Sequence, residues 1–367
     1  MARNNSDLFI VCGERSGDLH GSELVKELFK INPNLKIHCW GGDLLKSAGA
    51  ILLEDYKSYS VMGFYEVLKR LYFLYKKIEK CKIDILKLNP KRVLLIDFPG
   101  FNLKIAKFCK RNNIKFDYYI PPKTWAWNSN RNIVLKKNIN SIYSILPFEK
   151  NYFMDEGIDI NYIGNPLVHR IKKNKLKKTD NYIALFPGSR ETEIKYSLPI
   201  LIQLVKKIKD EKFLVFGVSN ISSLLYEGIL KYDHVEIVYD DTYGSLDKCE
   251  SAVVMSGTAS LEVALTNTPH VVVFKASYTS YLIARLLVKL KYISLVNLIL
   301  GKEIVKELIQ DNFNINNLIN ELKSLKKNQI KKIMRENFYE LRRKIGDTNS
   351  SKKLADIIYK EILCFSS

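Results

Sequence analysis

The chain has 367 residues, a size at which a single hydrophobic core stops growing, so we expect two domains and exclude a small disulfide-stapled module. Hydrophobic residues make up 47% and charged residues 26%, which excludes a disordered chain. The formal net charge of +19 indicates an anionic partner, and nucleic acid, a membrane surface or a phosphorylated substrate would each fit. Genome-wide enrichment in lysine would give the same surplus.

No secretion or metal-binding signal stands out. The apolar stretch near the N-terminus is too short for a signal peptide, and the lipophilic region 278–300 is interrupted by Arg285, Lys289 and Lys291. We therefore expect a cytoplasmic protein that could touch a membrane. The six cysteines show no C-x-x-C pair and no histidine at metal-ligand spacing, which predicts reduced, mostly buried thiols: Cys12, Cys39, Cys81, Cys109, Cys249 and Cys364.

Short apolar runs followed by a glycine-containing loop and a helix-periodic segment occur in both halves of the chain. They lie at 8–12 and 92–97 in the first half and at 182–186, 213–217 and 251–255 in the second. This order is typical of βα units, so each half is predicted to form a parallel, helix-covered sheet. The expected architecture is two α/β halves facing a central cleft, with ligands outside the carboxyl ends of the strands.

The domain boundary is placed in a lysine-rich stretch without a helical stripe near residue 171. We predict an N-terminal domain over 1–170, a C-terminal domain over 171–335, and a helical segment over 336–367 that could pack back on the N-terminal domain. The basic helices after residue 310 are interpreted as solvated faces, because no nucleic-acid recognition motif accompanies them.

Two loops in the second half could hold a nucleotide diphosphate. No G-x-G-x-x-G loop with its acidic partner and no Walker lysine motif is present, which argues against NAD and P-loop chemistry. Backbone N–H groups, a guanidinium and hydroxyls instead follow two buried strands, where they could bind phosphate. Glu262, one turn into the second helix, could accept hydrogen bonds from a ribose. The loop residues are Gly188, Ser189 and Arg190, and Gly257, Thr258 and Ala259.

Acidic residues follow the strands of the first half. Asp97 ends a strand and could act as a general base toward a hydroxyl, or it could simply cap the next helix. Asp18 and Glu14 are further candidates, and Asp18 could equally be the N-cap of a helix beginning near Gly21. Trp125 and Trp127 lie in a loop with two prolines and could line the substrate site.

The segment 61–80 reads as a helix with an apolar stripe that includes Tyr75 and Ile78, which is ordinarily core. Opposite and beside the stripe, aromatic residues stand among lysines, a pattern that suits a lipid headgroup boundary. Plain packing and membrane contact are both left open. The candidate contact residues are Tyr65, Lys69, Tyr72, Phe73 and Lys77.

Ten ordered segments span nearly the whole chain. They are GERSGDLHG (13–21), GG (41–42), VMGFYEVL (61–68), IDFPGFN (96–102), YIPPKTWAWNSNR (119–131), LPFE (146–149), YIGNPL (162–167), FPGSRETEI (186–194), SGTASLEVAL (256–265) and ISLVNLILGKEIVKELIQ (293–310). Together they resemble the lipid-A-disaccharide synthase family. Two positions depart from the family pattern: Asn165 stands where a histidine is usual, and Gly100 where an acidic residue is usual.

The resemblance implies an inverting glycosyltransferase of the GT-B type with two Rossmann-like domains. The implied reaction transfers 2,3-diacylglucosamine from UDP to the 6-hydroxyl of 2,3-diacylglucosamine 1-phosphate, giving a β-1,6 disaccharide 1-phosphate and UDP. No acidic D-x-D cluster is present to hold a metal, so we expect a reaction without a metal or a cofactor. Both substrates are acylated, so the resemblance implies a peripheral protein on the inner face of the cytoplasmic membrane, in contact with anionic lipid and without a nucleic-acid partner. A homodimer is left open.

The site residues follow from the same resemblance. Asp97 is the candidate base and Asp18 the second choice, with Arg190 and the amides before Thr258 on the leaving diphosphate. The late segment adds Asn297, Glu307 and Gln310 on the donor side, and the acceptor side adds Glu14, Ser16, Asn102, Trp125 and Trp127. Alternatives are another GT-B UDP-sugar transferase, a UDP-sugar epimerase, or a non-catalytic peripheral-membrane binding protein.

Overall fold

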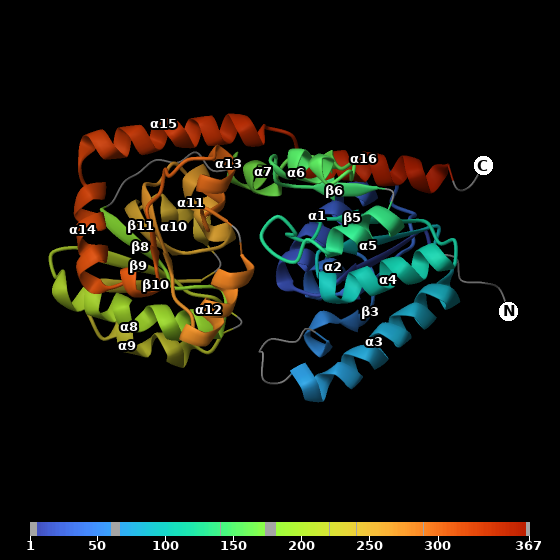
Figure 1. Ribbon diagram of the computed structural model, residues 1–367, viewed down its shortest axis with the longest axis horizontal. Coiled ribbons are helices and arrows are strands. Elements are labelled where there is room, and N and C mark those ends of the chain that lie inside the picture. Colours follow the sequence, from blue (N-terminus) through green and yellow to red (C-terminus); the bar gives the residue numbers. More distant parts are fainter. Residues whose placement is uncertain are drawn as a thin grey trace. The chain divides into compact units, whose positions relative to one another are not determined.

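The computed structural model describes residues 6–59, 67–139, 141–172, 181–219, 221–239, 241–288 and 290–364, with the backbone alone for 67–71 and 172. It divides into two compact units (Figure 1). Unit 1 comprises residues 1–166 and 348–367, and unit 2 comprises 167–347. The predicted boundary near 335 falls inside a continuous helix, α15 (Asn328–Ile345), and α7 (Pro166–Lys172) begins at the first division.

Unit 1 contains a seven-stranded sheet, as far as the described residues show, in the order β3-β2-β1-β4-β5-β6-β7, and each neighbouring pair is parallel. Its central strands are apolar runs buried on both faces, as helix-covered parallel strands require. The strands are β1 (Leu8–Cys12), β2 (Ile37–Gly41), β3 (Ile51–Asp55), β4 (Arg92–Ile96), β5 (Phe116–Tyr119), β6 (Ile142–Ser144) and β7 (Asn161–Tyr162).

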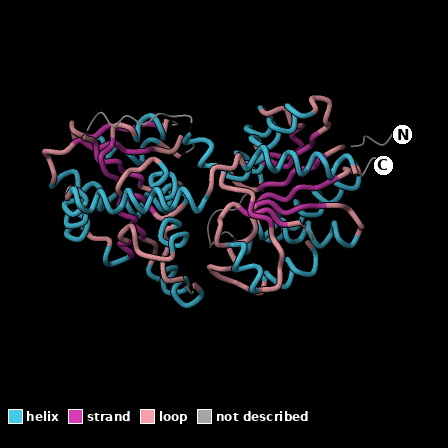
Figure 2. Tube along the Cα trace, turned by 90° about the horizontal axis from the view of Figure 1, so that it is seen from above, coloured by secondary structure: helices cyan, strands magenta, loops and turns pink. Residues whose placement is uncertain are grey.

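Helices cover both faces of this sheet (Figure 2). Successive residues of β1 alternate between two cores: Phe9 packs with residues of α3 (Val67–Leu88), α4 (Pro99–Arg111), α5 (Arg131–Asn138) and α6 (Glu149–Asp155). Ile10 packs on the opposite face with residues of α1 (Arg15–Ile31), α2 (Asp43–Ser47) and α16 (Ser350–Leu363). The last helix of the chain therefore completes one layer of unit 1.

Unit 2 repeats the design with a six-stranded sheet in its described part, in the order β10-β9-β8-β11-β12-β13, again with parallel neighbours. Its strands are β8 (Tyr182–Phe186), β9 (Lys212–Phe216), β10 (Val235–Val238), β11 (Cys249–Met255), β12 (His270–Phe274) and β13 (Glu307–Ile309). Its helices are α8 (Glu191–Lys207), α9 (Glu227–Leu230), α10 (Thr242–Leu246), α11 (Thr258–Leu265), α12 (Tyr278–Leu287), α13 (Leu295–Leu300), α14 (Ile315–Leu325) and α15.

The two parallel α/β sheets confirm the predicted fold class. The six cysteines are free thiols, and five of them are buried, as expected, while Cys364 is exposed. No helix within the described ranges is long and apolar enough to cross a membrane.

Candidate active site

The site in unit 1 begins where the strand order reverses. β1 pairs with β2 on one side and β4 on the other, so the loops after β1 and β4 leave the sheet in opposite directions. Such a switch point is where open α/β sheets bind ligands, outside the carboxyl ends of the strands. Cys12 and Ile96 are paired in register, so Gly13 and Asp97 follow them at the same edge.

Asp97 and Phe98 lie in a strained turn directly after β4. Their φ angles are +47° and +48°, a left-handed conformation that costs non-glycine residues about 1–3 kcal/mol each. Two fully buried side chains hold the turn: Tyr118 Oη and Asn102 Nδ2 donate to the Asp97 carbonyl oxygen at 2.7 and 2.8 Å. The N-cap of α4 is Phe98, so the alternative in which Asp97 caps that helix is wrong.

The loop after β1 packs directly on this turn. A Cβ atom on Gly13 would lie 2.2 Å from ring atoms of Phe98, so only glycine leaves room for the ring. Glu14 is the N-cap of α1 and is half-buried, and Ser16 is exposed in the first turn of that helix. Gly13 therefore allows the loop after β1 to pack against the turn after β4 at the switch point.

Asp18 has a structural role that sequence reasoning missed. It lies inside α1, which begins at Arg15 and not near Gly21, so Asp18 is not the N-cap of its own helix. Its buried carboxylate instead accepts hydrogen bonds from the backbone N–H groups of Gly42 (2.8 Å), Leu44 (3.0 Å) and Leu45 (3.2 Å) at the start of α2. Burial raises its pKa, and these three hydrogen bonds oppose the rise. Catalysis by Asp18 stays a prediction.

Trp125 is anchored by an acidic residue that was not among the candidates. Its Nε1 donates to Glu149 Oε1 at 2.9 Å, and Ser144 Oγ donates to Glu149 Oε2 at 2.7 Å. Glu149 is 3% exposed, and burial raises its pKa to about 7 against the opposing effect of these hydrogen bonds. Trp127 is exposed, with Arg131 4.9 Å from its ring centroid. Glu149 is the last residue of the motif LPFE (146–149), but no local sequence pattern predicts that its carboxylate is buried.

In unit 2 the loop predicted to bind phosphate binds a carboxylate of the chain itself, that of Glu193. The Glu193 carboxylate accepts hydrogen bonds from the backbone N–H groups of Ser189 (2.8 Å) and Arg190 (3.3 Å), and Arg190 Nη1 lies 3.2 Å from it. Gly188 has φ +140°, and a Cβ there would lie 2.5 Å from Glu193 Cβ. The amides and the guanidinium do converge on one negative charge, and Glu193 is the charge that they bind in this structure.

The second loop of unit 2 lies at the same edge, because Val254 of β11 pairs with Phe186 of β8. These strands form the switch point of the second sheet. Gly257 and Thr258 are exposed and Ala259 is half-buried at the start of α11. Ser260 is fully buried and hydrogen-bonded to His270 and Ser294 (3.1 and 2.9 Å).

Glu262 is half-buried near the start of α11. Tyr243 Oη lies 3.4 Å from Glu262 Oε1, and burial raises the pKa of Glu262 while the nearby Arg170 charge lowers it. The carboxylate is thus held beside a hydroxyl and a guanidinium, one turn from the exposed loop. Ribose binding by Glu262 stays a prediction.

The residues predicted on the donor side in the late segment, Asn297, Glu307 and Gln310, form hydrogen bonds mainly with the backbone. Asn297 Nδ2 donates to Val305 O and Glu307 Oε1, both at 2.8 Å, and its Oδ1 accepts from two backbone amides. Glu307 also accepts from the N–H groups of Ile293 and Ser294, at 2.9 Å each. Gln310 pairs with both backbone groups of Ala276 through its side-chain amide. These bonds shape α13 and the loop after β12, and direct contact with a donor stays a prediction.

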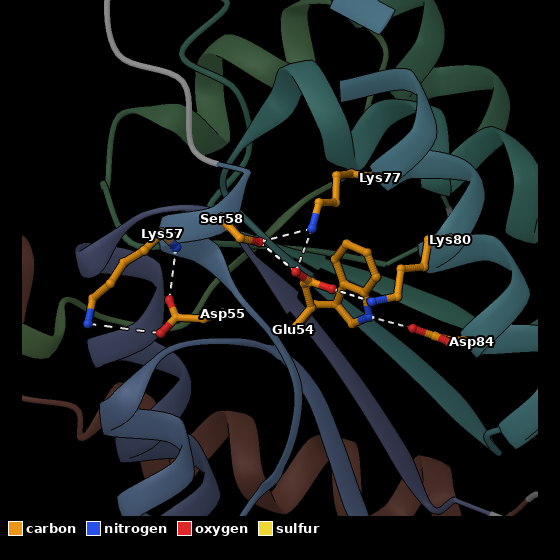
Figure 3. Close-up of polar contacts among 8 residues, drawn as sticks. Glu54, Asp55, Lys57, Ser58, Lys77, Lys80 and Asp84 are labelled. Atoms are coloured by element: carbon orange, nitrogen blue, oxygen red, sulfur yellow. Dashed lines mark hydrogen bonds and ion pairs between the residues drawn. The ribbon is translucent and has the colours of Figure 1, made fainter. Parts of the chain in front are cut away.

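Helix α3 carries the candidate membrane residues, of which Tyr65 and the Lys69 side chain lie outside the described residues. Tyr72 and Phe73 are 67% and 40% exposed, and Tyr75, expected in the core stripe, is 57% exposed, whereas Ile78 is buried as expected. Lys77 points to Glu54 of β3 and binds it at 2.6 Å (Figure 3). Lys77 therefore fastens the helix to the sheet edge, with Lys80 as a second partner of Glu54.

Over the described ranges, no group of three or more His, Cys, Asp or Glu side chains is placed to hold a metal ion. The expectation of a metal-free reaction stays a prediction.

Sequence comparison matches this architecture to a known family. The model of the family described as lipid-A-disaccharide synthetase matches residues 8–358. The lipid-A-disaccharide synthase of Syntrophus aciditrophicus (strain SB) is 33% identical over 96% of this chain and 97% of that protein. Lipid-A-disaccharide synthase 1 of Legionella pneumophila (strain Paris) is 35% identical over 84% of both chains.

Solved structures share the fold at low identity. The UDP-GlcNAc 2-epimerase of Neisseria meningitidis bound to UDP-GlcNAc superposes with a TM-score of 0.67 at 14% identity, over 96% of this chain and 99% of that chain. The glycotransferase of kitacinnamycin gives a TM-score of 0.67 at 14% identity, over 97% and 99%.

Two parallel α/β units, each with loops gathered at a switch point, define a GT-B-type protein, the architecture shared by glycosyltransferases and UDP-GlcNAc epimerases. Within that class the sequence is decisive, and the chain belongs to the lipid-A-disaccharide synthetase family. It is accordingly a glycosyltransferase of lipid A biosynthesis.

Proposed function

We propose that this chain transfers a 2,3-diacylglucosaminyl group from UDP to the 6-hydroxyl of 2,3-diacylglucosamine 1-phosphate. The products are the β-1,6-linked disaccharide 1-phosphate and UDP. The observation that carries the proposal is the turn at Asp97: a carboxylate at the switch point of unit 1, in a left-handed conformation fixed by two buried side chains. Backbone strain of this kind persists only where the surrounding structure holds it in place, and it clusters at active sites.

Asp97 is the proposed general base. It takes the proton of the acceptor 6-hydroxyl as the oxygen attacks the anomeric carbon of the donor. The new C–O bond forms as the bond from that carbon to the β-phosphate oxygen breaks, and UDP leaves with the bonding electrons, which inverts the configuration. A positioned base typically contributes about 100- to 10,000-fold to the rate of such a step.

Unit 2 is the proposed UDP-binding unit. The amides of Ser189 and Arg190 bind a carboxylate in this structure, which supports their ability to hold a negatively charged oxygen. A diphosphate there would replace Glu193 as the partner of Arg190, and the exposed N-terminus of α11 would add its partial positive charge. Stabilising the leaving group by donors fixed in advance supports a reaction without a metal.

The acylated substrates suggest attachment to the inner face of the cytoplasmic membrane. On α3, Tyr72 and Tyr75 are largely exposed beside Lys76, whose Nζ lies 4.6 Å from the Tyr72 ring centroid. Helix α12 of unit 2 has no buried residue and exposes Tyr278 and Leu286. Aromatic and basic side chains together suit the boundary between anionic headgroups and acyl chains.

The test is a mass-spectrometric assay of the purified protein with UDP-2,3-diacylglucosamine and 2,3-diacylglucosamine 1-phosphate. We expect a disaccharide 1-phosphate and one UDP per product, also in the presence of EDTA. Parallel incubations with unacylated UDP-N-acetylglucosamine test for epimerisation and for transfer without acyl chains. Product from the unacylated donor alone, or no product from either donor, would overturn the proposal.

A further inference from the structure

Unit 2 contains a pocket of about 490 Å³ that none of the candidate catalytic, donor-binding or acceptor-binding residues lines. It lies between the C-terminal end of α11 and one face of α15, two helices that pack together (Figure 1). The exposed loop at Gly257 and Thr258 is at the other end of α11. The volume of the pocket falls within the range of about 300–1,000 Å³ that is usual for small-molecule sites.

Hydrogen bonds between α15 and the turn after α11 hold one wall of the pocket in place. Arg342 Nη2 donates to the carbonyl oxygen of Leu265 at 3.0 Å, which satisfies one of the last carbonyls of the helix. The turn continues through Thr266 to Asn267, which has a φ of +60°, and Asn267 Nδ2 lies 3.3 Å from Tyr339 Oη. The pocket is thus a built feature of the fold.

The lining of the pocket is positively charged. Arg335 and Arg342 are seven residues apart on α15, about two helical turns, so they project from the same face. No carboxylate is among the lining residues that the structure describes. Glu340, on the same helix, is paired with Lys302 at 3.0 Å and Lys344 at 3.8 Å, so its charge is already balanced.

The guanidinium of Arg335 has one unsatisfied donor. Its Nε is buried, and it has no hydrogen-bond partner within the described part of the chain. An unpaired buried donor is unfavourable, and turning this guanidinium toward an acceptor in the pocket breaks no hydrogen bond at Nε. Guanidinium groups bind phosphate oxygens in a bidentate geometry. The Tyr339 hydroxyl, which accepts a hydrogen bond from Asn267, can add a further donor.

We propose that this pocket binds a phosphoryl group, carried either by a soluble phosphate ester or by a lipid headgroup. Two arginines, a tyrosine hydroxyl and no acid favour a multiply charged anion over a carboxylate or a neutral ligand. The pocket is independent of the proposed transferase reaction, because no residue given a role in that reaction lines it.

The experiment measures the affinity of the whole protein for inorganic pyrophosphate by calorimetry, with UDP at saturation so that the proposed donor site is filled. Arg335→Gln should weaken pyrophosphate binding at least tenfold. Arg343→Gln removes the same charge from α15 without touching the pocket, so it should stay within twofold of the wild type. UDP affinity, measured separately, should be the same in all three proteins.

Equal weakening in Arg335→Gln and Arg343→Gln would show general electrostatic attraction and overturn the proposal, as would the absence of pyrophosphate binding by the wild type. Arg335→Lys keeps the charge and loses the planar donor pair, so it provides a second test, with an expected loss of at least threefold, if the glutamine variant unfolds. If phosphatidylglycerol vesicles compete with pyrophosphate and neutral phosphatidylcholine vesicles do not, the ligand is a lipid headgroup. If neither kind of vesicle competes, the ligand is a soluble phosphate ester.

Discussion

The hydroxyl of Tyr118 on β5 donates a 2.7 Å hydrogen bond to the main-chain carbonyl of Asp97 at the end of β4. Tyr118 is fully buried, and burial raises the pKa of its hydroxyl, so it remains a donor at every physiological pH. The bond acts on the backbone of Asp97, so Tyr118 orients the carboxylate without having to contact a substrate. If Asp97 is the base, as proposed, Tyr118 is its positioning residue.

Tyr118→Phe should therefore lower kcat while leaving the KM for the UDP-sugar nearly unchanged. The loss of the hydrogen bond to a strained turn should also reduce the free energy of unfolding by about 1–2 kcal/mol. Steady-state kinetics and urea unfolding measure the two effects. The control is Tyr182→Phe, which removes the hydroxyl that binds Glu236 at the surface of unit 2 and should change neither quantity appreciably. An unchanged kcat in Tyr118→Phe would contradict the positioning role.

Replacing Asp97 tests the base directly. Asp97→Asn keeps the shape of the side chain and removes its ability to take a proton, so turnover should fall by about 100- to 10,000-fold. UDP affinity should be preserved, because the loops proposed to bind UDP belong to unit 2. Single-turnover product formation and UDP calorimetry separate these effects. Substantial turnover in this variant would remove Asp97 from the mechanism.

The central strands were predictable from sequence. The runs at 8–12 and 182–186 are β1 and β8, and the run at 92–97 contains β4, because strands buried on both faces must be apolar throughout. Edge strand β3 is only half-buried and β7 has two residues, so neither leaves a comparable pattern. Helix starts are harder to predict: Gly17 and Gly21 favour a loop where the structure has the first turns of α1.

The site was predictable only in part, since many of its bonds join residues that are distant in sequence. Asp97 was recognisable at a strand end, but its partner Tyr118 is 21 positions away. Asp18 binds amides 24 to 27 residues later, and Glu149 accepts from Trp125 across 24 residues. Sequence patterns with a period of two or 3.6 residues carry no information about such pairs.

Glu149 should make stability depend on pH near neutrality. Its pKa is about 7 in the folded protein against 4.5 for the ordinary side chain, so the folded state holds a proton that the unfolded state releases. Stability contributed by this group is therefore full below about pH 4.5 and falls as the pH rises to 7, by up to about 3 kcal/mol.

Glu149→Gln should remove this dependence of stability on pH. Between pH 5 and 8 the free energy of unfolding of the variant should therefore rise relative to that of the wild type, by about 1–3 kcal/mol. Urea unfolding measures the difference. Tryptophan fluorescence should titrate near pH 7 in the wild type only, since Trp125 donates to this carboxyl. Glu156→Gln, an exposed neighbour after α6, is the matched control. Parallel stability profiles of wild type and Glu149→Gln would refute the assignment.

Glu54 gives the opposite pH dependence. Burial raises its pKa, but hydrogen bonds from Lys77, Lys80 and Ser58 outweigh burial and lower the pKa to about 2, from 4.5. Its stabilising contribution is complete above about pH 4.5 and is lost as the pH falls toward 2. Glu54→Gln should therefore destabilise the protein at pH 6, by about 2 kcal/mol, and hardly at all near pH 2.

Acid unfolding followed by circular dichroism measures this difference, and hydrogen exchange in α3 localises it to the helix that the lysines anchor. Glu191→Gln breaks an exposed pair with Lys195 and should shift the acid midpoint far less. An equal shift in both variants would mean that Glu54 contributes no more than an ordinary surface charge.

The exposed side of α3 can be tested for membrane contact apart from its anchoring. Phe73→Glu places a negative charge among exposed aromatic residues, so it should lower co-sedimentation with vesicles containing phosphatidylglycerol several-fold. Met154→Glu makes a comparable change at an exposed apolar position on α6 and should have little effect. Because Phe73 is 40% exposed, both variants should keep nearly the wild-type thermal midpoint. Equal vesicle binding by the two variants would leave α3 with a purely structural function, since Lys77 and Lys80 already account for its attachment to β3.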